Sequence, residues 1–210
     1  MRLNRTQWAS VTAVVLALLF AGGALTVASA DRDEAPRTPT AESADAGFAR
    51  DMAVHHQQAV EMSFIVRDRT RDEAVRRLAY DIANTQANQR GMMLGWLDMW
   101  GLPKVQSGVP PMTWMGMGAH DDETAGEDGE LMPGMATRAE IEQLSKASGR
   151  AAEVLYLKLM TDHHKGGVHM AQGCVERCVP GVERDLAQGM VEAQESEIRL
   201  MADMLKQRGA

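Results

Sequence analysis

The sequence has few of the residues on which the common metal and cofactor signatures depend. Its 210 residues include only two cysteines and six histidines. They form no Cys-x-x-Cys-His haem attachment, no His-Glu-x-x-His zinc protease motif, no Glu-x-x-His pair of di-iron bundles and no phosphate-binding glycine loop. The sequence therefore gives little support to an enzyme of these classes.

Basic residues are also scarce. The chain has 22 lysines and arginines against 29 acids, a net charge of −7, and residues 121–130 hold six acids without a base. Without residues 1–30, which carry two arginines and no acid, the net charge is −9. An acidic chain of this kind is a poor partner for nucleic acid. It could attract cations, although a charge run such as 121–130 is more often a solvated loop.

Only one long apolar run occurs, at residues 11–28, and it follows Arg2 and Arg5. The small residues Ala28-Ser29-Ala30 end it, as in a secretory signal. Because the run is near the lower length limit of a membrane-spanning helix, residues 1–30 are predicted to be a cleaved signal peptide or an N-terminal membrane anchor. No cysteine follows the small residues, so a lipoprotein anchor is unsupported. Either alternative places the working domain outside the cytoplasm, after a flexible acidic and proline-containing tether at residues 31–46.

From residue 47 onward the pattern becomes helical. Apolar or histidine side chains recur every three or four residues, at Phe48, Met52, His55, Ala59, Met62 and Val66. Thr70 followed by Glu73, and Thr137 followed by Glu140, indicate capping boxes that open helices. We expect long helices over residues 47–69, 70–100, 149–178 and 182–207, and a short helix after Thr137.

The two histidine pairs lie in segments that repeat. MAVHHQQAVEM at 52–62 and MTDHHKGGVHM at 160–170 are identical at five of eleven positions, at an offset of 108 residues. The same offset continues into the following helices, where it pairs Leu78 with Leu186, Gln86 with Gln194 and Met93 with Met201. The sequence therefore contains two copies of one helical hairpin.

The repeat predicts the architecture. The two hairpins cover residues 47–101 and 137–208, and a methionine-rich connection at 102–136 joins them. Neither hairpin can bury its apolar seam alone. We therefore expect an all-α fold in which the two hairpins pack as one four-helix bundle over residues 47–208.

Histidine and methionine share the buried face of both repeats. In each repeat a methionine and the first histidine are three residues apart on the seam, and the second histidine lies at the edge of the same face. A buried imidazole without a partner is costly, and here the cost arises twice. One alternative is that polar residues on the facing helices satisfy the rings. The other, favoured for a duplicated motif, is metal ligation in which these residues hold the ring tautomers. The polar residues are Gln86, Gln89, Gln194 and Glu197.

Ligand softness indicates which metal would bind. Imidazole suits copper, zinc, nickel and iron, whereas thioether sulfur selects Cu(I). Copper, as Cu(I), is therefore the first choice, and zinc or iron is less favoured. The connection holds further soft ligands that no helical stripe requires, and these form either a second metal site or an adaptable packing surface. They are Met112, Met115, Met117, His120, Met132 and Met135.

Three other features stay open from the residues alone. Cys174 and Cys178 are one helical turn apart, and in an exported protein a disulfide is the leading interpretation, with a thiolate metal pair or free thiols as alternatives. His169 is either a further ligand or a surface residue. Asp51 and Glu61 could supply oxygen ligands or a general base, but the second repeat has no acid at either place.

The motifs resemble a known family. DMAVHHQQAVEM, LMTDHHKGGVHMA, the intervening MPGMATRAEIEQL and the Gln-x-x-(Gln/Glu) helices are similar to the bacterial family named domain of unknown function 305. The similarity covers nearly all of residues 46–208. It implies an exported bundle of ferritin-like architecture and, as in members that have been studied, copper binding outside the cytoplasm with a part in copper resistance. The ligands that it implies are Met52, His55, His56, Met62, Met160, His163, His164 and Met170.

These observations favour an extracytoplasmic copper-binding protein that sequesters or transfers copper. The four paired histidines would anchor the metal, and the four methionines would supply soft ligands or an apolar shell. The expected partners are copper ions and other copper-handling proteins, with the membrane reached only through the N-terminal segment. A metal-dependent redox enzyme on the same bundle is the first alternative. A structural module whose histidines form a buried polar network is the second.

Overall fold

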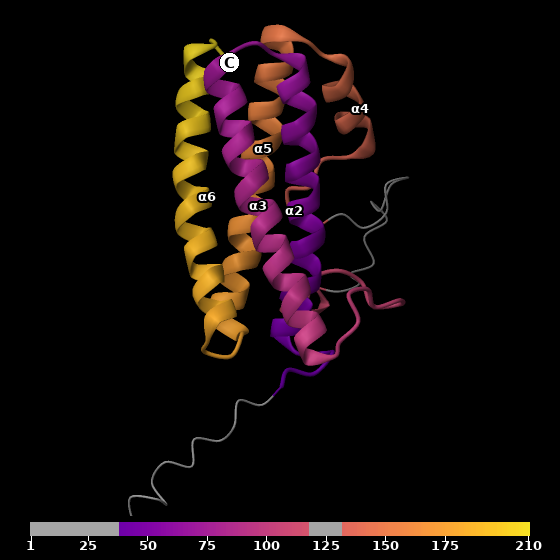
Figure 1. Cartoon of the computed structure of the whole chain (residues 1–210). Helices are drawn as coiled ribbons and strands as arrows, with labels where there is room; N and C mark the ends of the chain where they lie inside the picture. The colour runs from indigo at the N-terminus through magenta and orange to yellow at the C-terminus, as the bar shows by residue number, and fades with distance from the viewer. Residues whose placement is uncertain (1–37, 118–131) are drawn as a thin grey trace, which may run out of the picture. The chain divides into compact units, whose positions relative to one another are not determined.

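The computed structural model describes residues 38–117 and 132–210, and regular structure in these two ranges is entirely helical. Between α3 and α5 in the chain come a 3-10 turn, η1 (Thr113–Met115), and a short helix, α4 (Arg138–Lys146). The prediction of an all-α four-helix bundle is confirmed. The long helices of this bundle (Figure 1) are α2 (Ala44–Arg69), α3 (Glu73–Trp100), α5 (Gly149–Arg177) and α6 (Val182–Gln207).

Several predicted features fall outside the described residues. The predicted signal peptide or anchor and the first part of the tether, residues 31–37, lie in residues 1–37, and His120 and the acidic run lie in residues 118–131. Within the two described ranges, no helix combines the length and the apolar character needed to cross a membrane. The chain from Pro39 to Ala210 forms one compact unit.

Both predicted hairpins are present. α2 packs along α3, α5 packs along α6, and the hairpins meet mainly through α2 and α5. α2 and α5 run in opposite directions (Figure 1), and the rings of His55 and His163 lie against each other where they cross. The seam predicted for α2 is fully buried at Phe48, Met52, His55, Ala59, Met62 and Val66. Burial of this seam therefore places the histidines at the centre of the bundle.

The helix ends follow local capping chemistry. Ser43 caps α2, because its hydroxyl accepts a hydrogen bond from the Ala46 N–H at 3.2 Å. α2 thus begins at Ala44 and includes three residues that the sequence pattern places in the tether. Thr137 and Glu140 form the predicted capping box of α4.

Thr70 does not open α3, so that part of the prediction is wrong. Its N–H caps the C-terminus of α2, and its hydroxyl donates to Glu153 of α5 at 2.6 Å. Asp72 caps α3 instead, and its carboxylate accepts a hydrogen bond from the Val75 N–H at 2.9 Å. The local pattern failed here because a residue remote in the sequence takes the Thr70 hydroxyl.

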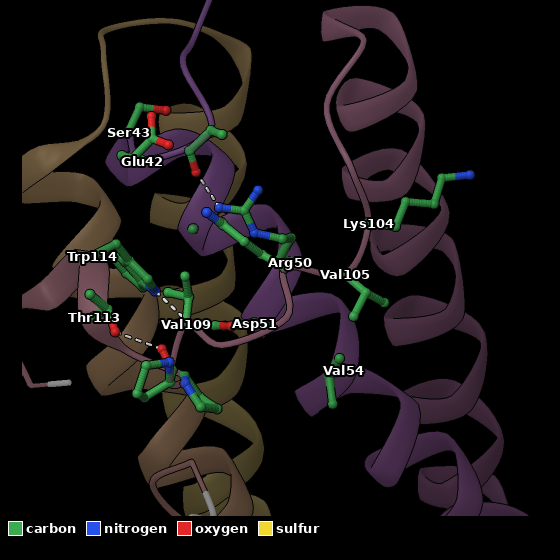
Figure 2. Close-up of a pocket in the computed structure, with 15 residues that line it drawn as sticks. Glu42, Ser43, Arg50, Asp51, Val54, Lys104, Val105, Val109, Thr113 and Trp114 are labelled. Carbon is green, nitrogen blue, oxygen red and sulfur yellow. Dashed lines mark hydrogen bonds between the residues drawn. The ribbon is translucent and has the colours of Figure 1, made fainter. Parts of the chain in front are cut away.

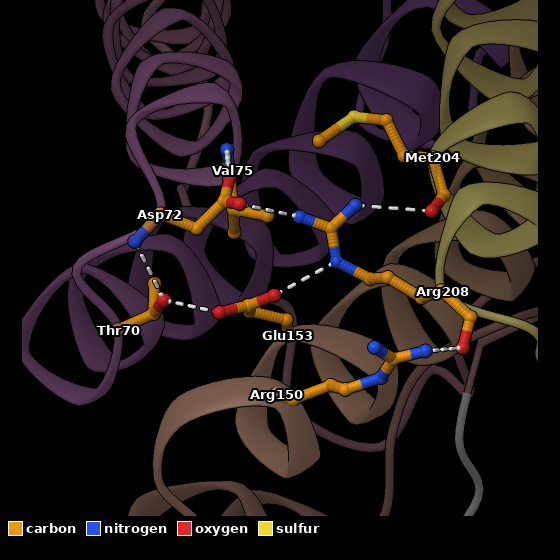
Figure 3. A network of polar contacts seen from close by, with 7 residues as sticks. All are labelled: Thr70, Asp72, Val75, Arg150, Glu153, Met204 and Arg208. Carbon is orange, nitrogen blue, oxygen red and sulfur yellow. Dashed lines mark hydrogen bonds and ion pairs between the residues drawn. The ribbon is translucent and has the colours of Figure 1, made fainter.

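A polar network closes the end of the bundle at which α2 ends and α5 begins (Figure 3). Arg208, at the end of α6, donates to Glu153 at 2.8 Å and pairs with Asp72 at 3.0 Å. Glu153 also accepts the Thr70 hydroxyl. The side chains of Arg208 and Glu153 are only 9% and 11% exposed, so water screens this ion pair weakly. One arginine therefore links both hairpins.

Replacing this arginine is expected to be costly. Arg208→Ala should lower the free energy of unfolding by about 3 kcal/mol, because it leaves the buried Glu153 carboxylate without its charged partner. Lys104→Ala, which removes an exposed ion pair with Asp98, is the matched control and should change stability little. Urea unfolding measures both, and an equal effect of the two substitutions would contradict the network's role.

Candidate metal centre

The paired histidines form one buried layer across α2 and α5. All four rings are fully buried, although the sequence places His56 and His164 at the edge of their face. The rings of His55 and His163 stack with centroids 3.8 Å apart and planes at 31°. His56 and His164 lie 6.5 and 6.2 Å from their neighbours on the same helix. The structure therefore brings both pairs into a single cluster.

Each ring uses its Nε2 atom in a hydrogen bond to an oxygen. His55 donates to the Pro133 carbonyl at 3.1 Å, and His163 donates to the His55 carbonyl at 3.0 Å. His164 Nε2 lies 2.8 Å from the Glu197 carboxylate, and His56 Nε2 lies 2.8 Å from the Gln89 amide oxygen. Because carbonyl and carboxylate oxygens only accept, these contacts place the ring proton on Nε2. In a neutral ring the Nδ1 atom then carries a free lone pair.

All four Nδ1 atoms are buried and have no hydrogen-bond partner among the described residues. Burial lowers the pKa of His55 to about 4 and that of His56 to about 3, and it holds the pKa of His163 well below the usual value. These three rings are therefore neutral near pH 7. Buried nitrogen lone pairs without a partner are unfavourable in a closed core, but they are what a metal ion requires.

The lowered histidine pKa values predict a loss of stability in acid. In the unfolded chain, His55 and His56 become protonated as pH falls below 6.5. In the folded protein they stay neutral until about pH 4 for His55 and about pH 3 for His56. The stability that these neutral rings contribute above pH 6.5 is therefore lost as pH falls. Between pH 7 and 5 this loss should be about 4 kcal/mol.

Glu183 has the opposite effect and must be removed from that measurement. Burial, followed by the nearby Asp45, raises the pKa of Glu183 to about 9, so its contribution to stability falls as pH rises. Urea unfolding of the metal-free Glu183→Gln protein therefore measures the loss without the opposing contribution of Glu183. Equal stability at pH 5 and pH 7 in this variant would show that the rings are not held neutral.

Only two of the four predicted polar partners contact the rings. Gln89 and Glu197 do so, whereas both amide atoms of Gln86 are buried without a hydrogen-bond partner among the described residues. Gln194 instead lies against Gly167, where an added Cβ would be 2.4 Å from its amide oxygen. The sequence could not separate these roles, because all four residues lie on faces that turn toward the core.

The methionines are sorted into two apolar clusters, one on each side of the histidine layer. The first cluster contains Met52 and Met170, and the second contains Met62 and Met160. All four are fully buried. Because α2 and α5 are antiparallel, each cluster takes one methionine from each repeat. A metal ion on either side of the histidines would therefore meet thioethers from both hairpins.

The segment at residues 132–136 reaches the histidine layer, which the sequence did not predict. The Pro133 carbonyl accepts the His55 hydrogen bond, and Gln58 holds the segment by binding both the N–H and the carbonyl of Ala136, at 2.7 and 2.8 Å. An added Cβ at Gly166 would lie 1.8 Å from the Pro133 carbonyl oxygen. At the 108-residue offset, Gly166 corresponds to Gln58 of the first repeat. This difference between the repeats is the sequence feature that could have indicated the close contact.

The methionines of the connection do not gather apart from the bundle. Met112 and Met132 are buried in the first cluster, and Met115 and Met135 pack against it. Met117 is 38% exposed, and His120 lies outside the described residues. The methionines of the candidate second site that are described thus lie in or against the first cluster, which also contains Met52 and Met170.

A cavity of about 340 Å³ lies beside α2, next to the segment that leads into η1 (Figure 2). Asp51, which the sequence offered as an oxygen ligand, instead accepts hydrogen bonds from the Met112 N–H and the Trp114 indole at 2.8 and 2.9 Å. Burial raises its pKa. Val54 and Val105 line the cavity, but none of the eight predicted ligands does. The cavity is therefore not part of the predicted metal site.

The remaining candidate residues are either in a disulfide or exposed to solvent. Cys174 and Cys178 are joined in a disulfide, and His169 and Glu61 are exposed. In the described part of the chain, no three of the paired histidines bring ring nitrogens within 4.8 Å of one another. A metal held here would therefore need methionine sulfur or a small adjustment of the rings in addition to these nitrogens.

Comparison with known proteins places the fold. The family model described as Domain of unknown function (DUF305) matches residues 45–205. A DUF305 protein from Streptomyces coelicolor is 71% identical, with a TM-score of 0.74 over 81% of this chain and 97% of that one. A DUF305 fragment from Deinococcus radiodurans is 32% identical, with a TM-score of 0.63 over 78% and 96%. CopM in its Cu(II)-bound form is 20% identical, with a TM-score of 0.57 over 79% and 97%, which shows a shared fold. No curated protein matches the sequence significantly.

Proposed function

The chain belongs to the DUF305 family, and from this premise we propose that it is an extracytoplasmic copper-binding protein that sequesters or transfers copper. One observation carries the proposal: each of the four paired histidines has a buried Nδ1 atom without a hydrogen-bond partner among the described residues, and burial keeps His55, His56 and His163 neutral near pH 7. The two methionine-containing apolar clusters lie on either side of these histidines. This donor set fits copper, and Cu(I) in particular, better than a hard cation.

The ligands that we propose are His55, His56, His163 and His164, with thioethers from Met52, Met170, Met62 and Met160. Gln89 and Glu197 would hold two rings in the tautomer that leaves Nδ1 free. The Pro133 carbonyl would do the same for His55. The protein would thus hold the Nδ1 lone pairs in a buried position, oriented before the metal binds.

The relatives support the proposal from outside the chain. CopM, which shares the fold, is known in Cu(II)-bound, Cu(I)-bound and silver-bound forms. The Streptomyces coelicolor relative carries the description of a secreted protein. Together with the apolar run at residues 11–28, this favours a location outside the cytoplasm, where copper ions and other copper-handling proteins would be the partners.

An anaerobic competition titration with a chromophoric Cu(I) chelator tests the function. The unaltered protein should bind Cu(I), and a variant with all four paired histidines changed to glutamine should lose most of this binding. Glutamine keeps an N–H near the Nε2 position but removes the Nδ1 lone pair. His169→Gln, which changes an exposed histidine on α5, is the matched control and should bind normally. Equal copper content in all three proteins would contradict the proposal.

A further inference from the structure

Three potential ligands meet at the end of the bundle opposite the Arg208 network. One carboxylate oxygen from Asp45, one from Glu183 and the sulfur of Cys178 lie within 4.8 Å of one another, and all three residues are buried. Asp45 is in the first turn of α2, Glu183 is in the first turn of α6, and Cys178 caps the C-terminus of α5. Three helices thus contribute one donor each.

Glu183 shows that this cluster lacks a partner. Glu183 is only 4% exposed, and neither of its carboxylate oxygens has a hydrogen-bond partner among the described residues. A buried carboxyl group is normally bonded, so an unbonded one indicates a place for a ligand. Asp45 is better satisfied, because it accepts a hydrogen bond from the Val179 N–H at 3.1 Å. That contact fixes the turn that carries Cys178.

The spacing suits a single ion. Ligands bound to one tetrahedral Zn(II) at about 2.0–2.3 Å lie roughly 3.3–3.8 Å from each other. The three atoms are already within 4.8 Å, so a small closure would complete the arrangement. A carboxylate and thiolate set is typical of zinc, which accepts both oxygen and sulfur ligands.

Cys178 is not available as a thiolate in this structure, because its sulfur is bonded to Cys174. We propose that Asp45, Glu183 and Cys178 form a Zn(II) site that is completed when the Cys174–Cys178 disulfide is reduced. A dithiol reductant would give up two electrons and two protons and become a disulfide itself. The S–S bond breaks, and each cysteine sulfur gains a proton. Zn(II) then displaces the proton of the Cys178 thiol and that of the buried Glu183 carboxyl group to solvent as it binds.

This site is independent of the proposed copper function. His55 is ten residues from Asp45 along α2, roughly 15 Å. The histidine-to-glutamine variant should therefore keep the additional zinc site. Failure of the copper proposal and failure of the zinc proposal give different results in the same set of proteins.

Zinc affinity of the full chain in its two redox states tests the proposal. The protein is reduced with a dithiol, the reductant is removed without oxygen, and Zn(II) binding is measured against a chromophoric chelator. The reduced protein should bind one more Zn(II) than the oxidised protein, at least tenfold more tightly than any ion held by the two carboxylates alone. Co(II) in place of Zn(II) should show thiolate-to-metal charge-transfer absorption only in the reduced protein.

Four variants make the result specific. Cys174→Ser leaves Cys178 permanently free, so it should bind the additional ion without reduction, whereas Cys178→Ser should not bind it in either state. Glu183→Gln should lose the additional ion, and Glu195→Gln, an exposed glutamate of the same helix, should keep it. Equal zinc binding by oxidised and reduced protein, by the two serine variants, or by both glutamine variants would overturn the proposal.

Discussion

Saturating Cu(I) is expected to raise the unfolding temperature of the metal-free protein by about 5–10 °C. A ligand that binds only the folded state stabilises it by about 2.7 kcal/mol at a free concentration one hundred times its dissociation constant. In a domain of 150–250 residues, each kcal/mol corresponds to about 2–4 °C. The shift depends on the free lone pairs at the histidine layer. Anaerobic thermal unfolding followed by circular dichroism measures it.

The histidine variants show where this stabilisation arises. With all four paired histidines changed to glutamine, added Cu(I) should leave the unfolding temperature unchanged, while His169→Gln should respond as the unaltered protein does. A full shift in the quadruple variant would place the copper elsewhere, for example among the methionines of the first cluster. No shift in any protein would favour the structural module. Oxygen consumption by the copper-loaded protein would instead favour the redox enzyme.

Gly166→Ala is expected to destabilise the protein by about 3 kcal/mol. The new methyl group would meet the Pro133 carbonyl oxygen, because an added Cβ lies 1.8 Å from that atom. Backbone cannot yield as a flexible side chain does, so the whole 132–136 segment must move. This movement would also take the acceptor from His55 Nε2 and free its ring to rotate. Urea unfolding measures the loss of stability.

Gly189→Ala is the matched control. Gly189 lies inside α6, and an added Cβ there meets no described atom within 4 Å. Alanine at such a place should stabilise the helix by about 0.5–1 kcal/mol. The two substitutions make the same chemical change in long helices, so opposite signs would isolate the contact with Pro133. A neutral Gly166→Ala would show that the segment does not press on α5.

The helical fold could be predicted from the sequence because it depends on the spacing of apolar residues within each helix and on the internal repeat. Apolar residues three and four apart set the seam of α2, and the 108-residue offset showed that α5 and α6 repeat α2 and α3. Where the outcome depended on a remote partner, the pattern failed. Thr70 and Glu73 match a capping box, but Glu153 takes the Thr70 hydroxyl and Asp72 caps the helix.

The candidate site was accessible in its residues but not in its arrangement. Spacing alone paired Met52 with the histidines of its own helix, whereas the antiparallel crossing groups Met52 with Met170. The sequence also gave no reason to connect His55 to Pro133, 78 residues away. Contacts of this kind arise from packing between elements, which local patterns do not encode. They nonetheless decide which ring nitrogen carries the proton.

Copper is proposed to bind to the Nδ1 atoms of the paired histidines. A crystal structure of the Cu(I)-loaded protein, with anomalous diffraction data collected at the copper absorption edge, tests it most directly. We expect anomalous density bonded to Nδ1 of these rings, with a sulfur of Met52, Met170, Met62 or Met160 nearby and each Nε2 still bonded to its oxygen. Copper bound only at other residues, or at Nε2 of the rings, would contradict it.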